Sequence, residues 1–282
     1  MICYNASLTK AYKTVKTTIP FHKMVASGND FIVVDNRRRV IKNPLQFTRE
    51  MCRSHTGIGA DGILLFENST KADFKMRILN ADGSEAEACG NGFRCIALYA
   101  REILNYPAHL RFESLSGLIQ ADVQTDRVRV RLAEPRDYRS RGEVEVLGHR
   151  LHYSFLNTGV PHVVIFVEGL SKIDVEGLGR AIRRHPDFQP KGTNVNFAEV
   201  KSRSEIDVRT YERGVENETQ ACGTGSTASA IVSSLAGYTV PPVKVHTRGG
   251  EILEIDFKRN GNKISHVFLT GQARIVFEGK LA

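Results

Sequence analysis

Three absences in this 282-residue sequence limit what the protein can be. No apolar run approaches the roughly 20 residues of a transmembrane helix, so we expect no membrane-spanning segment. The five cysteines form no dense framework, and their odd number favours free thiols in a reducing compartment, which predicts a cytoplasmic protein. They also provide too few clustered ligands for a zinc site, and no cofactor fingerprint is evident, so we expect neither metal nor cofactor.

The remaining composition is that of an ordinary globular protein, with 41% hydrophobic and 25% charged residues. The net charge is +8, but the basic residues are scattered among 31 acidic ones. This distribution favours a solvated basic surface over a nucleic-acid-binding surface, and it suits an anionic small substrate.

The first 20 residues differ in composition from the rest of the chain. They contain Lys10, Lys13 and Lys16 and many hydroxyl groups, but no acidic residue and no arginine. No long apolar core follows, so the segment is not a secretory signal. An organelle transit peptide and an extension without a role remain the alternatives.

Two short segments of the chain are near-copies of each other, Glu85–Gly92 and Glu218–Gly225. Each contains a cysteine, Cys89 or Cys222, with an acidic residue four positions before it and a Gly-x-Gly directly after it. The recurrence predicts an internal duplication with two related halves.

A segment without proline that is predicted to be helical follows each motif, at 93–104 and at 226–236. A thiol at a helix N-terminus has its thiolate stabilised, which predicts a lowered pKa for both cysteines. The N–H groups of the same turns can bind a carboxylate. A single motif of this kind would be explained by a buried cysteine that only packs in the core and has no chemical role. Two matched motifs instead indicate a pair of thiols that act as acid and base on opposite faces of one carbon.

The predicted secondary structure consists mostly of strands joined in hairpins, with a third helix at 174–184, and this indicates an α+β fold. Asp174 is the expected N-cap of that helix. The expected strands lie at 31–34, 63–66, 74–79, 128–132, 163–167, 206–211, 252–257 and 267–269.

Pro135 marks a plausible junction between the halves. We therefore expect an N-terminal extension over 1–20, a first half over 21–134 and a second half over 135–267. Strands at about 268–282 either return to the first half or stay with the second.

Several further segments appear in a fixed order along the chain. Taken with the cysteine motifs, they resemble diaminopimelate epimerase from about Phe21 to the C-terminus. The segments are Gly28-Asn29-Asp30-Phe31, Asn80-Ala81-Asp82-Gly83-Ser84-Glu85, Pro161-His162, Gly192-Thr193-Asn194 and Tyr211-Glu212-Arg213-Gly214.

The resemblance implies two pseudo-symmetric halves, each a curved, mostly antiparallel sheet around a central helix, with the active site in the cleft between them. It implies interconversion of LL- and meso-diaminopimelate without pyridoxal phosphate or metal, in lysine and cell-wall precursor synthesis. The implied partner is a small amino-acid substrate, with neither nucleic acid nor membrane. A homodimer is one alternative for the oligomeric state, which the sequence leaves open.

The resemblance also implies roles for individual residues. Cys89 and Cys222 would be the acid/base pair, tuned by His162 and Glu212 respectively. Arg213 would bind the distal carboxylate, where a guanidinium can form a bidentate pair. The remaining substrate-binding positions would be Asn29, Asn80, Gly90, Asn91, Asn194, Gly223 and Thr224.

This sequence departs from the family pattern at three places. Val160 stands where the family usually has asparagine, and that asparagine helps to recognise the distal end of the substrate. Val25-Ala26-Ser27 replaces a usual His-Gly-Leu, and the loop around Glu216-Asn217 is about one residue longer. A racemase for another amino acid, of the histidine or proline type, is therefore the alternative function. A thiol–disulfide oxidoreductase would need closely spaced cysteines, and a binding module would need no pair of activated thiols.

Overall fold

A computed structural model describes residues 18–281, and their order of elements confirms the expected α+β class. The helices are α1 (Pro44–Met51), α2 (Gly90–Glu102), α3 (Val175–Arg184) and α4 (Gly223–Leu235), with short 3₁₀ turns at Leu170–Lys172 and Pro186–Phe188.

The strands fall into two consecutive groups along the chain. The first group is β1 (Ile19–Ala26), β2 (Asn29–Asp35), β3 (Gly62–Glu67), β4 (Phe74–Asn80), β5 (Glu85–Ala86), β6 (His109–Ser114), β7 (Gly117–Gln124) and β8 (Arg127–Arg131). The second is β9 (Arg136–Val146), β10 (His149–Asn157), β11 (Pro161–Phe166), β12 (Asn194–Ser202), β13 (Glu205–Glu212), β14 (Asn217–Thr219), β15 (Val243–Thr247), β16 (Ile252–Asn260), β17 (Lys263–Gln272) and β18 (Arg274–Leu281).

The two groups repeat one topology. In the first half β1 pairs antiparallel with β2, β2 parallel with β3, β3 antiparallel with β4, and β4 parallel with β6. In the second half β10, β11, β12, β13 and β15 pair in the same sequence of directions. Helix α1 lies between β2 and β3 in the chain, and α3 lies between β11 and β12. The duplication predicted from the two cysteine motifs therefore extends over the whole fold.

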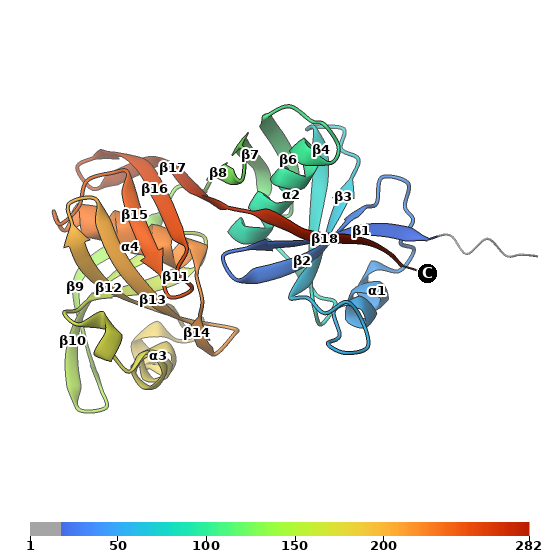
Figure 1. Cartoon of the computed structure of the whole chain (residues 1–282). Coiled ribbons are helices and arrows are strands. Elements are labelled where there is room, and N and C mark those ends of the chain that lie inside the picture. The colour runs from blue at the N-terminus through green and yellow to red at the C-terminus, as the bar shows by residue number, and fades with distance from the viewer. Residues whose placement is uncertain (1–17, 282) are drawn as a thin grey trace, which may run out of the picture.

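The halves are joined by the antiparallel pairing of β8 with β17, and β18 then runs on to pair with β1 (Figure 1). Because β8 ends at Arg131 and β9 begins at Arg136, we propose that the halves divide at residues 134 and 135. Strand β1 already begins at Ile19, and residues 1–17 of the expected extension lie outside the described part of the chain.

Each half wraps its sheet around one central helix, α2 or α4 (Figure 1). Residues 91–100 of α2 and 225–234 of α4 are all buried, so neither helix has a solvent-facing side. The α4 segment consists mainly of serine, threonine and alanine, whose small side chains let the surrounding strands approach closely. Within residues 18–281, no helix combines the length and the apolar character needed to span a membrane.

The predicted strands and the N-cap at Asp174, whose carboxylate accepts from the Gly177 N–H at 2.9 Å, are confirmed. The predicted starts of the two central helices are wrong by three residues, because each helix already begins at the glycine after its cysteine. Each cysteine is thus the N-cap residue itself. Helix α1 was not expected from the sequence; it begins with Asn43 as N-cap and Pro44 in its first turn.

Candidate active site

A cavity of about 420 Å³ lies where the first turns of α2 and α4 meet. The two helix ends are neighbours, since the Cβ position of Gly223 lies 3.9 Å from Oδ1 of Asn91. The cavity is lined from both halves by the predicted residues Asn29, Cys89, Gly90, Asn91, Glu212, Cys222, Gly223 and Thr224. The fold therefore brings both thiols and both glycine-rich turns to one space.

Each thiol sits at the start of its helix with contacts to the first turn. The half-buried Cys89 accepts a hydrogen bond from the Gly92 N–H, with 3.4 Å between nitrogen and Sγ. Cys222 is 6% exposed, and its Sγ lies 3.5 Å from Oγ1 of Thr224. Extended backbone at both cysteines turns the chain into the helix, as an N-cap residue requires.

The expectation of lowered thiol pKa values is wrong for the substrate-free protein. Burial raises the pKa of both thiols, because a thiolate loses hydration there. Hydrogen bonds from the N–H groups of Asn91 and Gly92 oppose this rise at Cys89, and one from Gly225 opposes it at Cys222. The helix N-termini thus only partly offset the cost of burying the charge.

Glu212, the last residue of β13, lies beside Cys222. Burial raises the pKa of its carboxyl group, while hydrogen bonds with Thr219 and the Cys222 thiol pull the pKa down. The carboxylate in turn raises the pKa of Cys222. A partly desolvated carboxylate in contact with a thiol is suited to accept the thiol proton.

His162, at the start of β11, is completely buried and does not line the cavity. Its Nδ1 lies 3.2 Å from the Asn196 amide nitrogen, which also donates to the Val163 carbonyl at 2.8 Å. That geometry makes Nδ1 the acceptor, so Nε2 carries the proton; within residues 18–281 this nitrogen has no hydrogen-bond partner. Burial and the charge of Arg213 lower the pKa of His162 to about 3, so the ring is a neutral donor.

Three other predicted substrate-binding residues lie outside the cavity lining. Asn194 connects two of the motifs, because its Oδ1 accepts from the Arg213 N–H at 2.7 Å and its amide nitrogen donates to the Pro161 carbonyl at 3.3 Å. The Arg213 guanidinium donates to the Lys191 carbonyl at 2.8 Å. The exposed Asn80 donates to Ser84 Oγ at 3.0 Å.

Within the cavity, two hydrogen bonds hold the side chain of Asn29. Its Oδ1 accepts from the Asn91 amide at 2.7 Å, and its own amide donates to Asp61 at 2.8 Å. This chain of contacts ties the turn between β1 and β2 to the first turn of α2.

Thr158 and Arg131 are among the lining residues that the sequence reasoning missed. Thr158 donates to the Thr224 carbonyl at 3.1 Å and so holds the first turn of α4. Arg131, on β8, also lines the cavity, and its guanidinium donates to Gln120 at 3.3 Å. The Asn157-Thr158-Gly159 segment next to Pro161-His162 was a signal for the first, whereas Arg131 lies in an ordinary alternating strand.

Comparison with known proteins gives concordant results. The sequence model of one family, described as diaminopimelate epimerase, matches residues 21–136 and 154–276. The diaminopimelate epimerase of Aquifex aeolicus (strain VF5) is 48% identical over 278 residues, which cover 93% of this chain and 97% of that protein.

Solved structures share the fold at low sequence identity. A phenazine biosynthesis protein of the PhzF family from Bacillus anthracis is 16% identical with a TM-score of 0.70, over 94% of this chain and 99% of the other. A hydroxyproline epimerase from Agrobacterium vitis, with trans-4-hydroxy-L-proline bound, is 15% identical with a TM-score of 0.67, over 95% and 93% of the two chains.

Proposed function

The chain belongs to the diaminopimelate epimerase family, and we propose that Cys89 and Cys222 carry out its reaction as a two-base pair. The protein is an isomerase of lysine biosynthesis that acts on a small amino acid and interconverts LL- and meso-diaminopimelate. The observation that carries the proposed mechanism is the placement of both thiols, from the two halves, on one cavity at adjoining helix N-termini.

In this mechanism one cysteine, as thiolate, removes the α-proton of the substrate. The other cysteine, as thiol, gives its proton to the opposite face of the same carbon. The configuration inverts, and the pair ends with its protonation states exchanged. The substrate carboxylate lies against the N–H groups of Gly90, Asn91, Gly223 and Thr224, which stabilise the charge that spreads into it during proton removal.

The other residues prepare this step. When Cys222 is the cysteine that acts as the base, Glu212, with which it is in contact, accepts its proton. The Nε2–H of His162 donates a hydrogen bond to the Cys89 thiolate when the halves close on the substrate. Asn29 binds the substrate within the cavity, while Asn80, Asn194 and Arg213 reach the distal amino-acid end on closure. Because no step requires an electron sink, we propose that the reaction needs no cofactor.

The first prediction concerns the fate of the α-hydrogen. Incubation of the protein with LL-diaminopimelate in D2O is expected to give meso product with solvent deuterium at the inverted α-carbon, because the donating thiol exchanges its proton with solvent. Chiral separation followed by mass analysis measures this. Turnover that depends on added pyridoxal phosphate would contradict the two-thiol mechanism.

A second prediction concerns Val160, which precedes Pro161 at the turn between β10 and β11. Replacement by the family's usual asparagine, Val160→Asn, is expected to change KM modestly and to leave diaminopimelate the preferred substrate. A panel that includes histidine, proline and diaminopimelate provides the measurement. Preference of the wild-type protein for another amino acid would make the racemase alternative the correct function.

We further propose a cytoplasmic location and, as one alternative, a homodimer. Buried thiols that must stay reduced support the location. Sedimentation of the full chain at several concentrations tests the oligomeric state.

A further inference from the structure

The two central helices differ in charge at one matched position. Five residues after Cys89 stands Arg94, and five residues after Cys222 stands Thr227. Thr227 only donates to the Gly223 carbonyl of its own helix, at 2.8 Å. Arg94 is 0% exposed and is the largest of the fully buried side chains among the described residues. An arginine is almost never fully buried without a partner, so this position requires an explanation.

Arg94 is held by groups from both halves. Its Nη2 donates to Ser27 Oγ in the turn between β1 and β2, and its Nε donates to the Gln272 carbonyl at 3.3 Å at the end of β17. Among residues 18–281, the only acidic group within ion-pair distance of Arg94 is Glu251 of the second half, at 3.8 Å from Nη2. Gly271 leaves the space that the guanidinium occupies, because a Cβ there would lie 3.1 Å from Arg94 Cζ.

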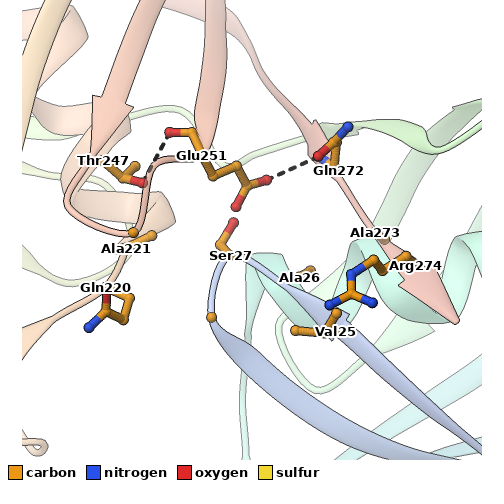
Figure 2. Close-up of a pocket in the computed structure, with 12 residues that line it drawn as sticks. Val25, Ala26, Ser27, Gln220, Ala221, Thr247, Glu251, Gln272, Ala273 and Arg274 are labelled. Carbon is orange, nitrogen blue, oxygen red and sulfur yellow. Dashed lines mark hydrogen bonds between the residues drawn. The ribbon is translucent and has the colours of Figure 1, made fainter. Parts of the chain in front are cut away.

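Glu251 lies at a second cavity, of about 310 Å³, on the boundary between the halves. Figure 2 shows its carboxylate between Gln272 and Ser27, with the side chain of Ser27 pointing toward it. Oε1 accepts from the Gln272 N–H at 3.1 Å, whereas Oε2 is buried and has no partner within residues 18–281. Ala221, the residue before Cys222, lines both this cavity and the cavity that holds the thiols.

The charges around the two thiols therefore have opposite signs. The positive charge of Arg94 lowers the pKa of Cys89, against the larger effect of burial. The negative charge of Glu212 adds to burial and raises the pKa of Cys222; it also raises the pKa of Cys89, where it is the smallest of the causes. Glu251, Cys95 and Cys89 are the titratable groups that act on Arg94 itself. Charges interact strongly in such a site, because little water is present to screen them.

We propose that Arg94 is a positioning residue that keeps a positive charge near Cys89 and thereby makes Cys89, rather than Cys222, the thiol that ionises more readily in the substrate-free enzyme. Ser27, Gln272 and Glu251 fix this charge across the boundary between the halves. The inference deepens the proposed two-base function and rests on it. Its test measures how readily each thiol ionises, so the result does not depend on which amino acid is turned over.

The test is the rate at which iodoacetamide alkylates each cysteine of the full chain at pH 7, measured by peptide mapping. Arg94→Met removes the charge and keeps much of the side-chain volume. We expect Cys89 to react about tenfold more slowly, because one pKa unit changes the thiolate fraction tenfold below the pKa, and Cys222 to change by less than about twofold. Arg94→Lys is expected to restore most of the Cys89 rate.

Glu251→Gln provides the opposite change. It removes the negative charge beside Arg94, so Cys89 is expected to react faster than in the wild type. Both variants leave one buried charge unpaired, so both are expected to melt at a lower temperature. Loosening of the structure alone would speed alkylation of both thiols in both variants. Thr227→Val, at the matched position of α4, is expected to leave the Cys89 rate unchanged.

The proposal is overturned if Cys89 reacts as fast or faster in Arg94→Met, or if Arg94→Met and Glu251→Gln shift its rate in the same direction. If Arg94→Met does not fold, Glu251→Gln provides the test by itself. Alkylation of Cys89 that is no faster in Glu251→Gln than in the wild type then contradicts the proposal. Absence of turnover with diaminopimelate would instead count against the proposed function and leave the alkylation result standing.

Discussion

Cys89→Ala and Cys222→Ala are each expected to lower the rate of epimerisation by about a thousand-fold or more. Loss of one positioned proton donor or acceptor removes about 10²–10⁴-fold, and inversion of the α-carbon needs a group on each face. The structure supports equal severity for the two variants, because the two thiols occupy the same place in the two halves and line one cavity. Initial rates of meso product formation from LL-diaminopimelate measure the effect.

The matched control is Cys95→Ala. Cys95 lies on the same helix as Cys89, is fully buried in the core around α2, and does not line the cavity. We expect it to lower stability, since it removes buried volume, while its turnover stays close to that of the wild type. Both active-site variants are expected to stay folded, because alanine is close to cysteine in size, although Cys89→Ala loses the hydrogen bond from the Gly92 N–H. Near-wild-type turnover by either would show that its cysteine is structural only.

Much of this fold could be predicted because the internal duplication is visible in two short, similar segments of the sequence. The cysteine motif occurs twice with the same spacing to an acidic residue and to glycines, and each copy leads into a central helix. Apolar runs located strands such as β2, β3 and β4, which the sequence placed at 31–34, 63–66 and 74–79. The starts of the central helices were placed too late, because glycine is a poor helix former and its place in a first turn follows from the cysteine cap.

The site could be predicted only as far as individual motifs reach. Its residues from the two halves converge because β8 pairs with β17 and β18 returns to β1, and these are long-range pairings. The direction of the thiol pKa shifts was mispredicted, since the helix N-terminus is visible in the sequence but the degree of burial is not. Arg94 was missed for a related reason: a helix buried on all sides has no amphipathic pattern that marks a charged residue as unusual.

Glu212→Gln is expected to lower epimerisation by about 10²-fold or more, while making Cys222 easier to ionise. The rate falls because the amide cannot accept the Cys222 proton, and loss of a general base has an effect of this size. The thiol ionises more readily because the Glu212 carboxylate, whose charge raises the pKa of Cys222, is gone. The Cys222 pKa therefore falls, and at pH 7 iodoacetamide is expected to alkylate Cys222 faster in the variant than in the wild type.

These opposite changes separate a lost proton acceptor from a damaged fold. Alkylation of the fully buried Cys95 is expected to stay slow in Glu212→Gln, whereas general unfolding would expose both thiols. Glu216→Gln is the matched control, because Glu216 lies four residues on, accepts from Arg183 at 3.1 Å, and is absent from the cavity lining. It is expected to keep near-wild-type turnover. If Glu212→Gln also turns over normally, or if its Cys222 reacts more slowly, Glu212 does not act on that thiol and the proton of Cys222 must leave by another route.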